Sequence, residues 1–217
     1  MLYIVATPIG NLKDVTLRAL EVLKSVDLIA CEDTRHSKIL LDQYDIKTPT
    51  TSFFQHNRLV KAQYLLGLLK EGKDIALISD AGTPGILDPG YNLINSAIKN
   101  NLAISVIPGP TALVHALVIS GKPTHEFIFA GFLPRRSQAR QNRLINLAAL
   151  NCTIVFYESS HRIISTLEDI RNILCDKEIV CVRELTKKFE EIKRGRAEEL
   201  LEQFKTQKPR GEFVVVI

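Results

Sequence analysis

A short loop rich in glycine, proline and aspartate, residues 78–90, lies between an apolar run at 75–78 and a helix-like run at 91–100. It holds three glycines, two prolines and two aspartates. Glycine lets a ligand approach the backbone closely, and proline stiffens the chain. A second such loop, Ile-Pro-Gly-Pro-Thr-Ala at 107–112, follows one strand later. Loops at the carboxyl ends of parallel strands bind ligands, so the pattern predicts a site built largely from main-chain groups.

Strand-like and helix-like patterns alternate through the first half of the chain. Buried strands are predicted at 2–6, 27–31, 75–78 and 103–107. Helical stripes lie between them, as in Leu17, Leu20 and Leu23. Such alternation favours a parallel sheet with crossover helices.

A second set of elements follows a candidate linker at residues 120–124. The pattern predicts strands at 127–132, 153–157, 179–183 and 213–217, and helices at 137–150, 163–174 and 197–204. Segment 187–194 is ambiguous, and as a strand it would make the second sheet mixed. The chain is therefore predicted to be an α/β protein of two lobes, a 1–121 N-terminal domain and a 122–217 C-terminal domain.

Bulk composition fits a globular protein with a mildly basic surface. The 217 residues are 46% hydrophobic and carry a net charge of +4, which is compatible with a polyanionic partner. The four cysteines form no CxxC pair, so Cys31 and Cys181 are expected to be buried free thiols. The uncharged stretch 100–121 is broken by Pro-Gly-Pro at 108–110. We therefore expect a cytoplasmic protein with no signal peptide, no membrane span and no metal site.

Three familiar nucleotide and hydrolase motifs do not fit this sequence. The first strand is followed by Ala-Thr-Pro-Ile-Gly-Asn at 6–11 rather than by GxGxxG, which argues against a Rossmann dinucleotide site. Residues 67–73 begin like a P-loop, but Asp74 replaces the serine or threonine and the segment leads from helix to strand. HExxH and GxSxG are absent from the sequence.

Polar residues at the predicted strand ends have two interpretations each. Asp80, beside Ser79 and Thr83, is a turn residue or a carboxylate that faces a cationic or hydroxyl-bearing ligand, and the second interpretation is favoured. Thr111 is a helix cap, a ligand contact, or both. Glu32, Asp33 and Arg35 follow the second strand; Asp33 caps a helix, or the group grips a substrate. His56 in its loop allows a base or stacking role, although an ordinary loop residue is favoured.

A basic segment marks the second half. Residues 127–157 contain no acid, and Arg135, Arg136, Arg140 and Arg143 fall within them. A helix places the last three on one face, where like charges repel without an acidic partner. The face is either simply solvated or binds a phosphate backbone.

Eight short motifs in this order resemble the tetrapyrrole methylase superfamily, the class III methyltransferases that use S-adenosylmethionine. The resemblance is strongest to the bacterial enzymes that 2′-O-methylate a cytidine of 16S ribosomal RNA. The motifs span the chain and lie at 6–12, 30–35, 79–84, 108–112, 131–134, 156–159, 183–187 and 211–212. Members of this group usually continue into a C-terminal helical extension, whereas this sequence ends in a predicted strand at 214–217.

The resemblance implies two α/β lobes with S-adenosylmethionine in the cleft between them, and a homodimer acting on 16S ribosomal RNA or the small ribosomal subunit. The resemblance implies cofactor contacts from both lobes, and the two glycine- and proline-rich loops add Ser79 and Pro108. The candidate cofactor-binding residues are Ile9, Ser79, Asp80, Thr83, Ile86, Pro108, Thr111, Ala112, Tyr157, Leu185 and Glu212.

A ribose 2′-hydroxyl is a weak acid, so methyl transfer to it benefits from a base. The candidates are Asp33, Glu32 and Glu158. The candidate RNA-binding residues are Arg35, Arg135, Arg136, Arg140, Arg143 and Lys187. Two alternatives remain open: a methylase acting on a corrin or sirohaem precursor, and a non-catalytic RNA-binding assembly factor.

Overall fold

The computed structural model describes residues 1–54, 58–88, 90–206 and 208–217, so His56 and Pro89 lie outside the described residues. It forms two compact units, Met1–Thr111 and Ala112–Ile217. The division precedes the boundary expected after residue 121. The reason is that α5 (Ala112–Ser120) packs on strands of the second sheet and so belongs to the second unit.

The first unit is a five-stranded parallel sheet in the order β3-β2-β4-β1-β5, which confirms the predicted parallel sheet. Its strands are β1 (Leu2–Val5), β2 (Leu28–Cys31), β3 (Thr50–Ser52), β4 (Ile75–Ile78) and β5 (Ile104–Ile107). Its helices are η1 (Leu12–Asp14), α1 (Leu17–Ser25), α2 (Thr34–Gln43), α3 (Arg58–Lys70) and α4 (Gly90–Lys99).

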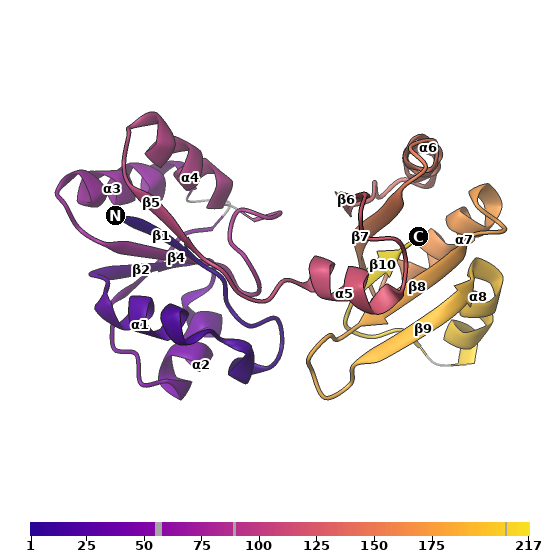
Figure 1. Ribbon diagram of the computed structural model, residues 1–217, viewed down its shortest axis with the longest axis horizontal. Coiled ribbons are helices and arrows are strands. Elements are labelled where there is room, and N and C mark those ends of the chain that lie inside the picture. The colour runs from indigo at the N-terminus through magenta and orange to yellow at the C-terminus, as the bar shows by residue number, and fades with distance from the viewer. Residues whose placement is uncertain (55–57, 89, 207) are drawn as a thin grey trace. The chain divides into compact units, whose positions relative to one another are not determined.

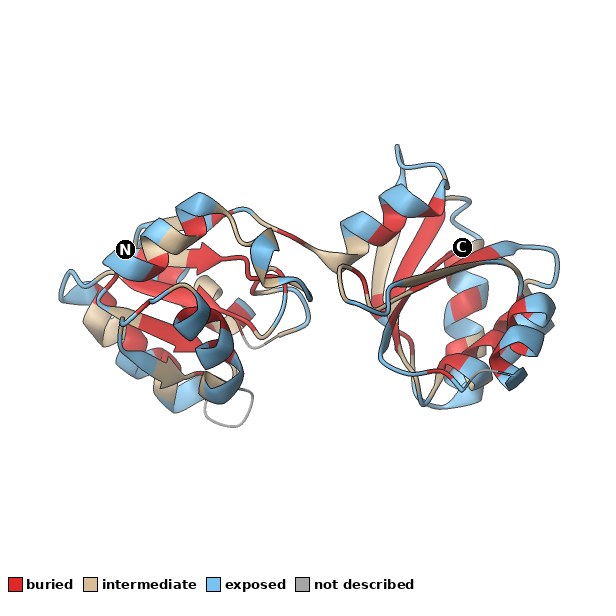
Figure 2. Ribbon diagram, turned by 90° about the horizontal axis from the view of Figure 1, so that it is seen from below, coloured by how far each residue is buried: buried red, intermediate tan, exposed pale blue. Residues whose placement is uncertain are grey.

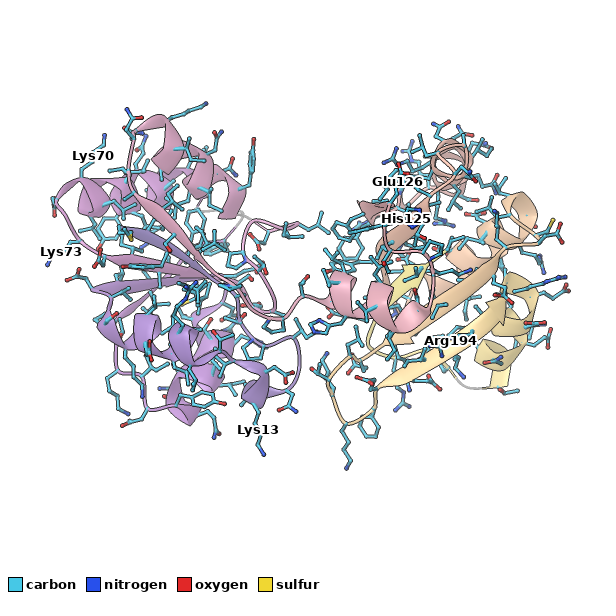
Figure 3. All side chains as sticks on the ribbon, in the orientation of Figure 1. Lys13, Lys70, Lys73, His125, Glu126 and Arg194 are labelled. Atoms are coloured by element: carbon cyan, nitrogen blue, oxygen red, sulfur yellow. The ribbon has the colours of Figure 1, made fainter. Side chains whose placement is uncertain are left out.

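Helices cover both faces of this sheet (Figure 1). Apolar side chains of α1 and α2 pack on one face, and those of α3 and α4 on the other. Every residue of the central strand β4 is buried. Buried residues concentrate in the strands, and exposed residues lie on the outer faces of the helices (Figure 2). Because β4 and β1 lie side by side within the sheet, the loops that follow them emerge at the same sheet edge. Lys70 and Lys73 lie at the opposite edge, before β4 begins (Figure 3).

The second unit is a mixed sheet in the order β6-β7-β10-β8-β9, as predicted. Its strands are β6 (Phe127–Phe132), β7 (Thr153–Ser159), β8 (Glu178–Arg183), β9 (Glu191–Arg196) and β10 (Glu212–Val216). β6 pairs with β7 in parallel, and the other pairs are antiparallel. The ambiguous segment 187–194 thus ends in strand β9.

Three helices form the main core of the second unit against one face of its sheet: α6 (Ser137–Ala148), α7 (Ile163–Ile173) and α8 (Ala197–Thr206). Helix α5 contacts β10 and β7. β7 and β8 both run antiparallel to β10, so their carboxyl ends and the start of β10 share one edge. The loops at that edge carry most of the candidate residues of this unit.

The cysteines are free, and Cys31 and Cys181 are buried as expected. Burial raises the pKa of Cys31 to about 11 and that of Cys181 to about 12. Within the described ranges, no helix has the length and apolar character needed to cross a membrane.

Candidate functional site

Four loops meet at the carboxyl edge of the first sheet, after β1, β2, β4 and β5. A two-way backbone bridge joins the loops of β1 and β4: Thr7 N donates to Gly82 O at 2.9 Å, and Gly82 N to Thr7 O at 3.1 Å. The buried Thr7 hydroxyl also donates to Ser79 O at 3.1 Å. Backbone and side-chain hydrogen bonds therefore join the loops after β1 and β4.

Glycines bring the loops close together. Gly82 has a φ of +79°, and a Cβ built on it would lie 3.6 Å from Ile9 Cγ2 and 3.7 Å from Pro110 O. A Cβ on Gly109 would lie 2.8 Å from the Cβ of Ala6, which is closer than packing allows. A side chain at Gly109 would thus separate the β5 loop from the β1 loop. Gly109 is required here for close backbone approach.

Asp80 links the loop after β4 to the loop after β2. Its Oδ1 accepts a hydrogen bond from the backbone N–H of Asp33 at 3.1 Å. Asp80 is half-buried at the start of the glycine-rich loop. The structure therefore shows one Asp80 oxygen joining the two loops, and the ligand-facing role of the carboxylate stays a prediction.

Asp33 is the N-cap of α2, as one of its two interpretations predicted. Its carboxylate accepts from Arg35 N at 2.8 Å, Arg35 Nε at 3.2 Å and Arg35 Nη2 at 2.8 Å. The side-chain bond from Arg35 is the main cause that lowers the pKa of Asp33 to about 2. Such a carboxylate is a weak base, and its oxygens are already engaged.

Glu32 has the opposite electrostatic setting. Its side chain is half-buried, and burial, with the nearby charge of Asp80, raises its pKa above the ordinary value. A hydrogen bond from the Asp80 backbone offsets part of this effect. A raised pKa makes a carboxylate a better proton acceptor. Of the three candidate bases, Glu32 has the environment best suited to the task.

Asp88 shapes the rest of the glycine-rich loop. Its Oδ1 accepts from Gly85 N and from Gly90 N, each at 2.8 Å. Burial raises its pKa, despite these two bonds that lower it. Beside this turn, the side chain of Ile86 is 47% exposed, so a predicted cofactor residue presents apolar surface to solvent.

A second cluster lies at the shared edge of the second sheet. Glu184, in the loop after β8, accepts through Oε1 from Glu212 N at 3.3 Å and from Lys187 Nζ at 3.0 Å. Gly211 has a φ of +78°, and a Cβ there would meet the Glu184 side chain. These contacts place two candidate cofactor residues, Leu185 and Glu212, in adjoining loops. Glu184 thus organises both loops, a role that its place in the motif at 183–187 does not reveal because its partner, Glu212, lies 28 positions away.

Tyr157, another candidate cofactor residue of this unit, lies on β7 opposite Val214 of β10. Its ring makes edge-on contacts with Phe129, at a centroid distance of 4.9 Å, and with Phe132, at 5.8 Å. Pro108, Thr111 and Ala112 lie in the segment from the end of β5 to the start of α5, and Thr83 is half-buried after Gly82.

Glu158 does not suit the role of an accessible base. It is 1% exposed. Its Oε2 accepts from the Thr166 hydroxyl at 2.7 Å and pairs with Arg162 at 3.3 Å, and its Oε1 accepts from Ser159 N at 2.9 Å. The carboxylate therefore holds the start of α7 against β7, and no oxygen is presented at the surface.

The prediction that Arg140 binds RNA is wrong. Arg140 is 3% exposed, and its guanidinium pairs with Asp169 of α7 at 2.6 Å. It also donates to the carbonyls of Arg135 at 3.1 Å and Ser165 at 3.2 Å. The acidic partner that the segment lacks comes from another helix, so Arg140 fixes α6 on α7.

The remaining basic candidates are accessible to different degrees. Arg135, Arg136 and Arg143 are exposed, and Arg136 is the N-cap residue of α6 rather than part of its face. The Arg35 side chain is 90% exposed although it pairs with Asp33. Lys187 is half-buried against Glu184. In the part of the chain that the structure describes, no group of three or more metal-ligating side chains occurs.

Comparison with known proteins agrees with this architecture. The family of tetrapyrrole (corrin/porphyrin) methylases matches residues 1–201. Among solved structures, cobalt precorrin-4 methyltransferase superposes with a TM-score of 0.74 at 19% identity, covering 99% of this chain and 93% of that one. Diphthine synthase gives 0.76 at 15% identity, covering 100% and 88%. At these identities the two structures show the fold alone.

Curated relatives are much closer in sequence. Ribosomal RNA small subunit methyltransferase I of Thermotoga maritima is 47% identical over 216 residues, covering 100% of this chain and 97% of that protein. Its counterpart in Halalkalibacterium halodurans is also 47% identical, covering 100% and 75%. The chain therefore belongs to the tetrapyrrole methylase family and, within it, to the group of the ribosomal RNA small subunit methyltransferase I proteins.

Proposed function

We propose that this protein transfers the methyl group of S-adenosylmethionine to the ribose 2′-oxygen of a cytidine in 16S ribosomal RNA. The observation that carries the proposal is the 47% identity, over the full chain, to relatives named ribosomal RNA small subunit methyltransferase I. The choice of cytidine and of the 2′-oxygen rests on the resemblance of the motifs alone.

The first unit offers a setting that fits S-adenosylmethionine. Gly82 allows the loop after β4 to approach the loop after β5, and Gly109 allows the loop after β5 to approach the loop after β1. In this proposal, main-chain amides and carbonyls of these loops are the principal groups that face the ligand. The carboxylate of Asp80 suits a cationic or hydroxyl-bearing ligand, and the exposed side chain of Ile86 suits an apolar surface. The cofactor contacts proposed here are Ile9, Ser79, Asp80, Thr83, Ile86, Pro108 and Thr111, with Ala112, Tyr157, Leu185 and Glu212 of the second unit.

S-adenosylmethionine, when bound, supplies a sulfonium methyl group that is already activated. The chain's own task is therefore to hold the attacking oxygen in line and to exclude water. Glu32 accepts the proton of the 2′-hydroxyl. Asp80 fixes the position of Glu32 indirectly, since it is bonded to the neighbouring Asp33 backbone. Asp33 itself stays ionised and caps α2.

The exposed arginines Arg135, Arg136 and Arg143 take phosphates of the RNA backbone in this proposal, together with Arg35 and Lys187. The net charge of +4 supports a polyanionic substrate. A 2′-hydroxyl acceptor restricts the substrate to RNA. We further propose that the protein acts in the cytoplasm as a homodimer.

Two assays test this function against its alternatives. Isothermal titration with S-adenosylmethionine and S-adenosylhomocysteine is expected to give saturable heat with both. Labelled cofactor is then incubated with unmethylated small ribosomal subunits or with uroporphyrinogen III. Label in the RNA alone supports the proposal, and label in the tetrapyrrole alone would overturn it. RNA binding without any cofactor heat would indicate an assembly factor instead.

A further inference from the structure

The hairpin that joins β8 to β9 has a tightly bonded tip at residues 184–190. Thr186 N donates to Glu190 Oε2 at 2.7 Å, and Glu190 N donates to Lys187 O at 3.2 Å. At the other side of the tip, Lys187 N donates to Glu184 O at 3.0 Å. These bonds close the segment on itself, so its side chains are presented from an ordered backbone.

The backbone of this tip is strained. Glu184 and Thr186 have φ values of +51° and +64°, in the left-handed region that residues with a Cβ avoid. For a β-branched residue such as Thr186 this conformation is uncommon and energetically unfavourable. The hydrogen bonds made by Glu184 and Glu190 stabilise this strained backbone conformation. The conformation in turn sets the direction of the residues that follow, including Phe189.

Phe189 follows in this tip and is 66% exposed. Single exposed apolar residues are ordinary on protein surfaces, so exposure alone decides nothing. Phe189, however, is preceded by two lysines, Lys187 and Lys188, and Lys188 Nζ lies 5.6 Å from the centroid of its ring. Among the ion pairs between described residues, none involves Lys188. An aromatic ring with an adjacent uncompensated cation is the arrangement that stacks a base and binds its phosphate.

We propose that the tip of the β8–β9 hairpin stacks an unpaired nucleobase of the substrate RNA on Phe189, with the Lys188 ammonium on the adjoining phosphate. The proposal rests on the proposed function only for the identity of the RNA. Recognition of RNA by unpaired bases stacked on aromatic side chains is common, because A-form duplexes hide their base edges. On β9, Arg194 is exposed and is labelled in Figure 3, whereas the Lys193 ammonium pairs with Glu191 at 3.2 Å.

The absence of tryptophan from the sequence gives a direct test. Phe189→Trp introduces one fluorophore at the tip, and a base stacked on it quenches its emission. The matched control is Phe127→Trp. Phe127 is 39% exposed and begins β6, directly after His125 and Glu126, which are labelled in Figure 3. Because β6 and β8 run in the same direction, Phe127 lies at the opposite edge of the sheet. Unmethylated small ribosomal subunits are expected to quench the first variant and leave the control unchanged.

Phe189→Ala provides the second arm. Loss of one stacked base costs about 1–3 kcal/mol, so affinity for the subunits should fall about 5- to 150-fold. Calorimetric affinity for S-adenosylhomocysteine should not change, which shows that the fold is intact.

The outcomes separate this inference from the proposed function. Unquenched emission in Phe189→Trp together with unchanged RNA affinity in Phe189→Ala would overturn the proposal, even if the wild-type protein methylates RNA. A change of oligomeric state in Phe189→Ala, measured by sedimentation, would overturn it in favour of a subunit contact. Quenching without methyl transfer would instead contradict the proposed function and leave this inference standing.

Discussion

The backbone N–H of Asp33 donates a hydrogen bond to Oδ1 of Asp80 at 3.1 Å, which joins the loops after β2 and β4. The two residues are 47 positions apart, and their hydrogen bond holds the loop after β2 and the loop after β4 together in the candidate site. On one side of it lies the glycine-rich loop proposed to hold the cofactor. On the other side lies Glu32, the proposed base.

Asp80→Ala is expected to weaken S-adenosylmethionine binding about 10- to 150-fold, since a hydrogen bond to a charged group contributes about 1.5–3 kcal/mol. Asp80→Asn keeps one acceptor oxygen and should lose less. Asp42→Ala, an exposed aspartate on α2, is the matched control. Isothermal titration measures all three. An affinity in Asp80→Ala equal to that of wild type would remove Asp80 from the cofactor site.

Glu32→Gln should lower kcat about 10²- to 10⁴-fold while cofactor affinity stays unchanged, as expected for loss of a general base. Because the pKa of Glu32 is raised, the wild-type rate should increase with pH as this carboxyl ionises, above the ordinary range for glutamate. That limb of the pH profile should vanish in the variant. Asp33→Asn is the comparison, and the account fails if it, rather than Glu32→Gln, abolishes the limb.

Gly109→Ala should reduce both cofactor affinity and stability, because its Cβ would lie 2.8 Å from the Cβ of Ala6. Overpacking of this kind costs about 1–3 kcal/mol. Gly67→Ala is the control: it lies in α3 with nothing within 4 Å of the added Cβ, and should stabilise the protein by about 0.5–1 kcal/mol. Thermal melts and titration calorimetry check both. Wild-type affinity of Gly109→Ala for the cofactor would show that close contact between the loops after β1 and β5 is not needed for binding.

Arg140→Ala should destabilise the protein by about 3–5 kcal/mol, because it leaves the buried Asp169 without its ionic partner. The double variant Arg140→Met with Asp169→Leu should recover much of that loss.

Arg143 is exposed on the same helix. Arg143→Ala should leave the free energy of unfolding within about 0.5 kcal/mol of wild type and reduce the salt slope of RNA binding by about 1. Urea unfolding and RNA titrations at several salt concentrations measure the two effects.

The pair of Arg140 and Asp169 also predicts a pH effect. Burial raises the pKa of Asp169, but hydrogen bonds from Gln141, Ser137 and Arg140 outweigh it, so the folded-state pKa lies below the unfolded one. The resulting stabilisation is complete above about pH 4 and is lost as the pH falls through the folded-state pKa. The double variant should lack this part of the acid destabilisation. An identical acid profile in both proteins would contradict the assignment.

The sequence predicted the elements that obey strong local rules. β4 was predicted with its observed bounds because four apolar residues run into a glycine-rich loop. The meeting of the loops around Gly82 and Gly109 follows from parallel strand order, which places carboxyl ends on one edge. Strand β3, with the sequence Thr-Thr-Ser, was missed because a short polar edge strand has no apolar alternation to reveal it.

Errors arose where a partner comes from elsewhere in the fold. Arg140 was predicted to lie on a charged face because its own segment lacks acids, yet Asp169 lies 29 positions away on α7. Glu158 lies at a strand end, where the sequence suggests an accessible side chain, but Thr166 of α7 and Arg162 at the N-cap of that helix bind its carboxylate. Helical spacing reveals which residues share a face, but it does not show what covers that face.

Methyl transfer to a ribose 2′-oxygen of small-subunit RNA leaves a product that mass spectrometry can identify. The protein is incubated with S-adenosylmethionine and unmethylated small ribosomal subunits, and the 16S RNA is digested to nucleosides. We expect 2′-O-methylcytidine, formed by the wild-type protein and at least about 10²-fold more slowly by Glu32→Gln. A base-methylated nucleoside, or no methylated nucleoside from a protein that binds the cofactor, would contradict the proposed function.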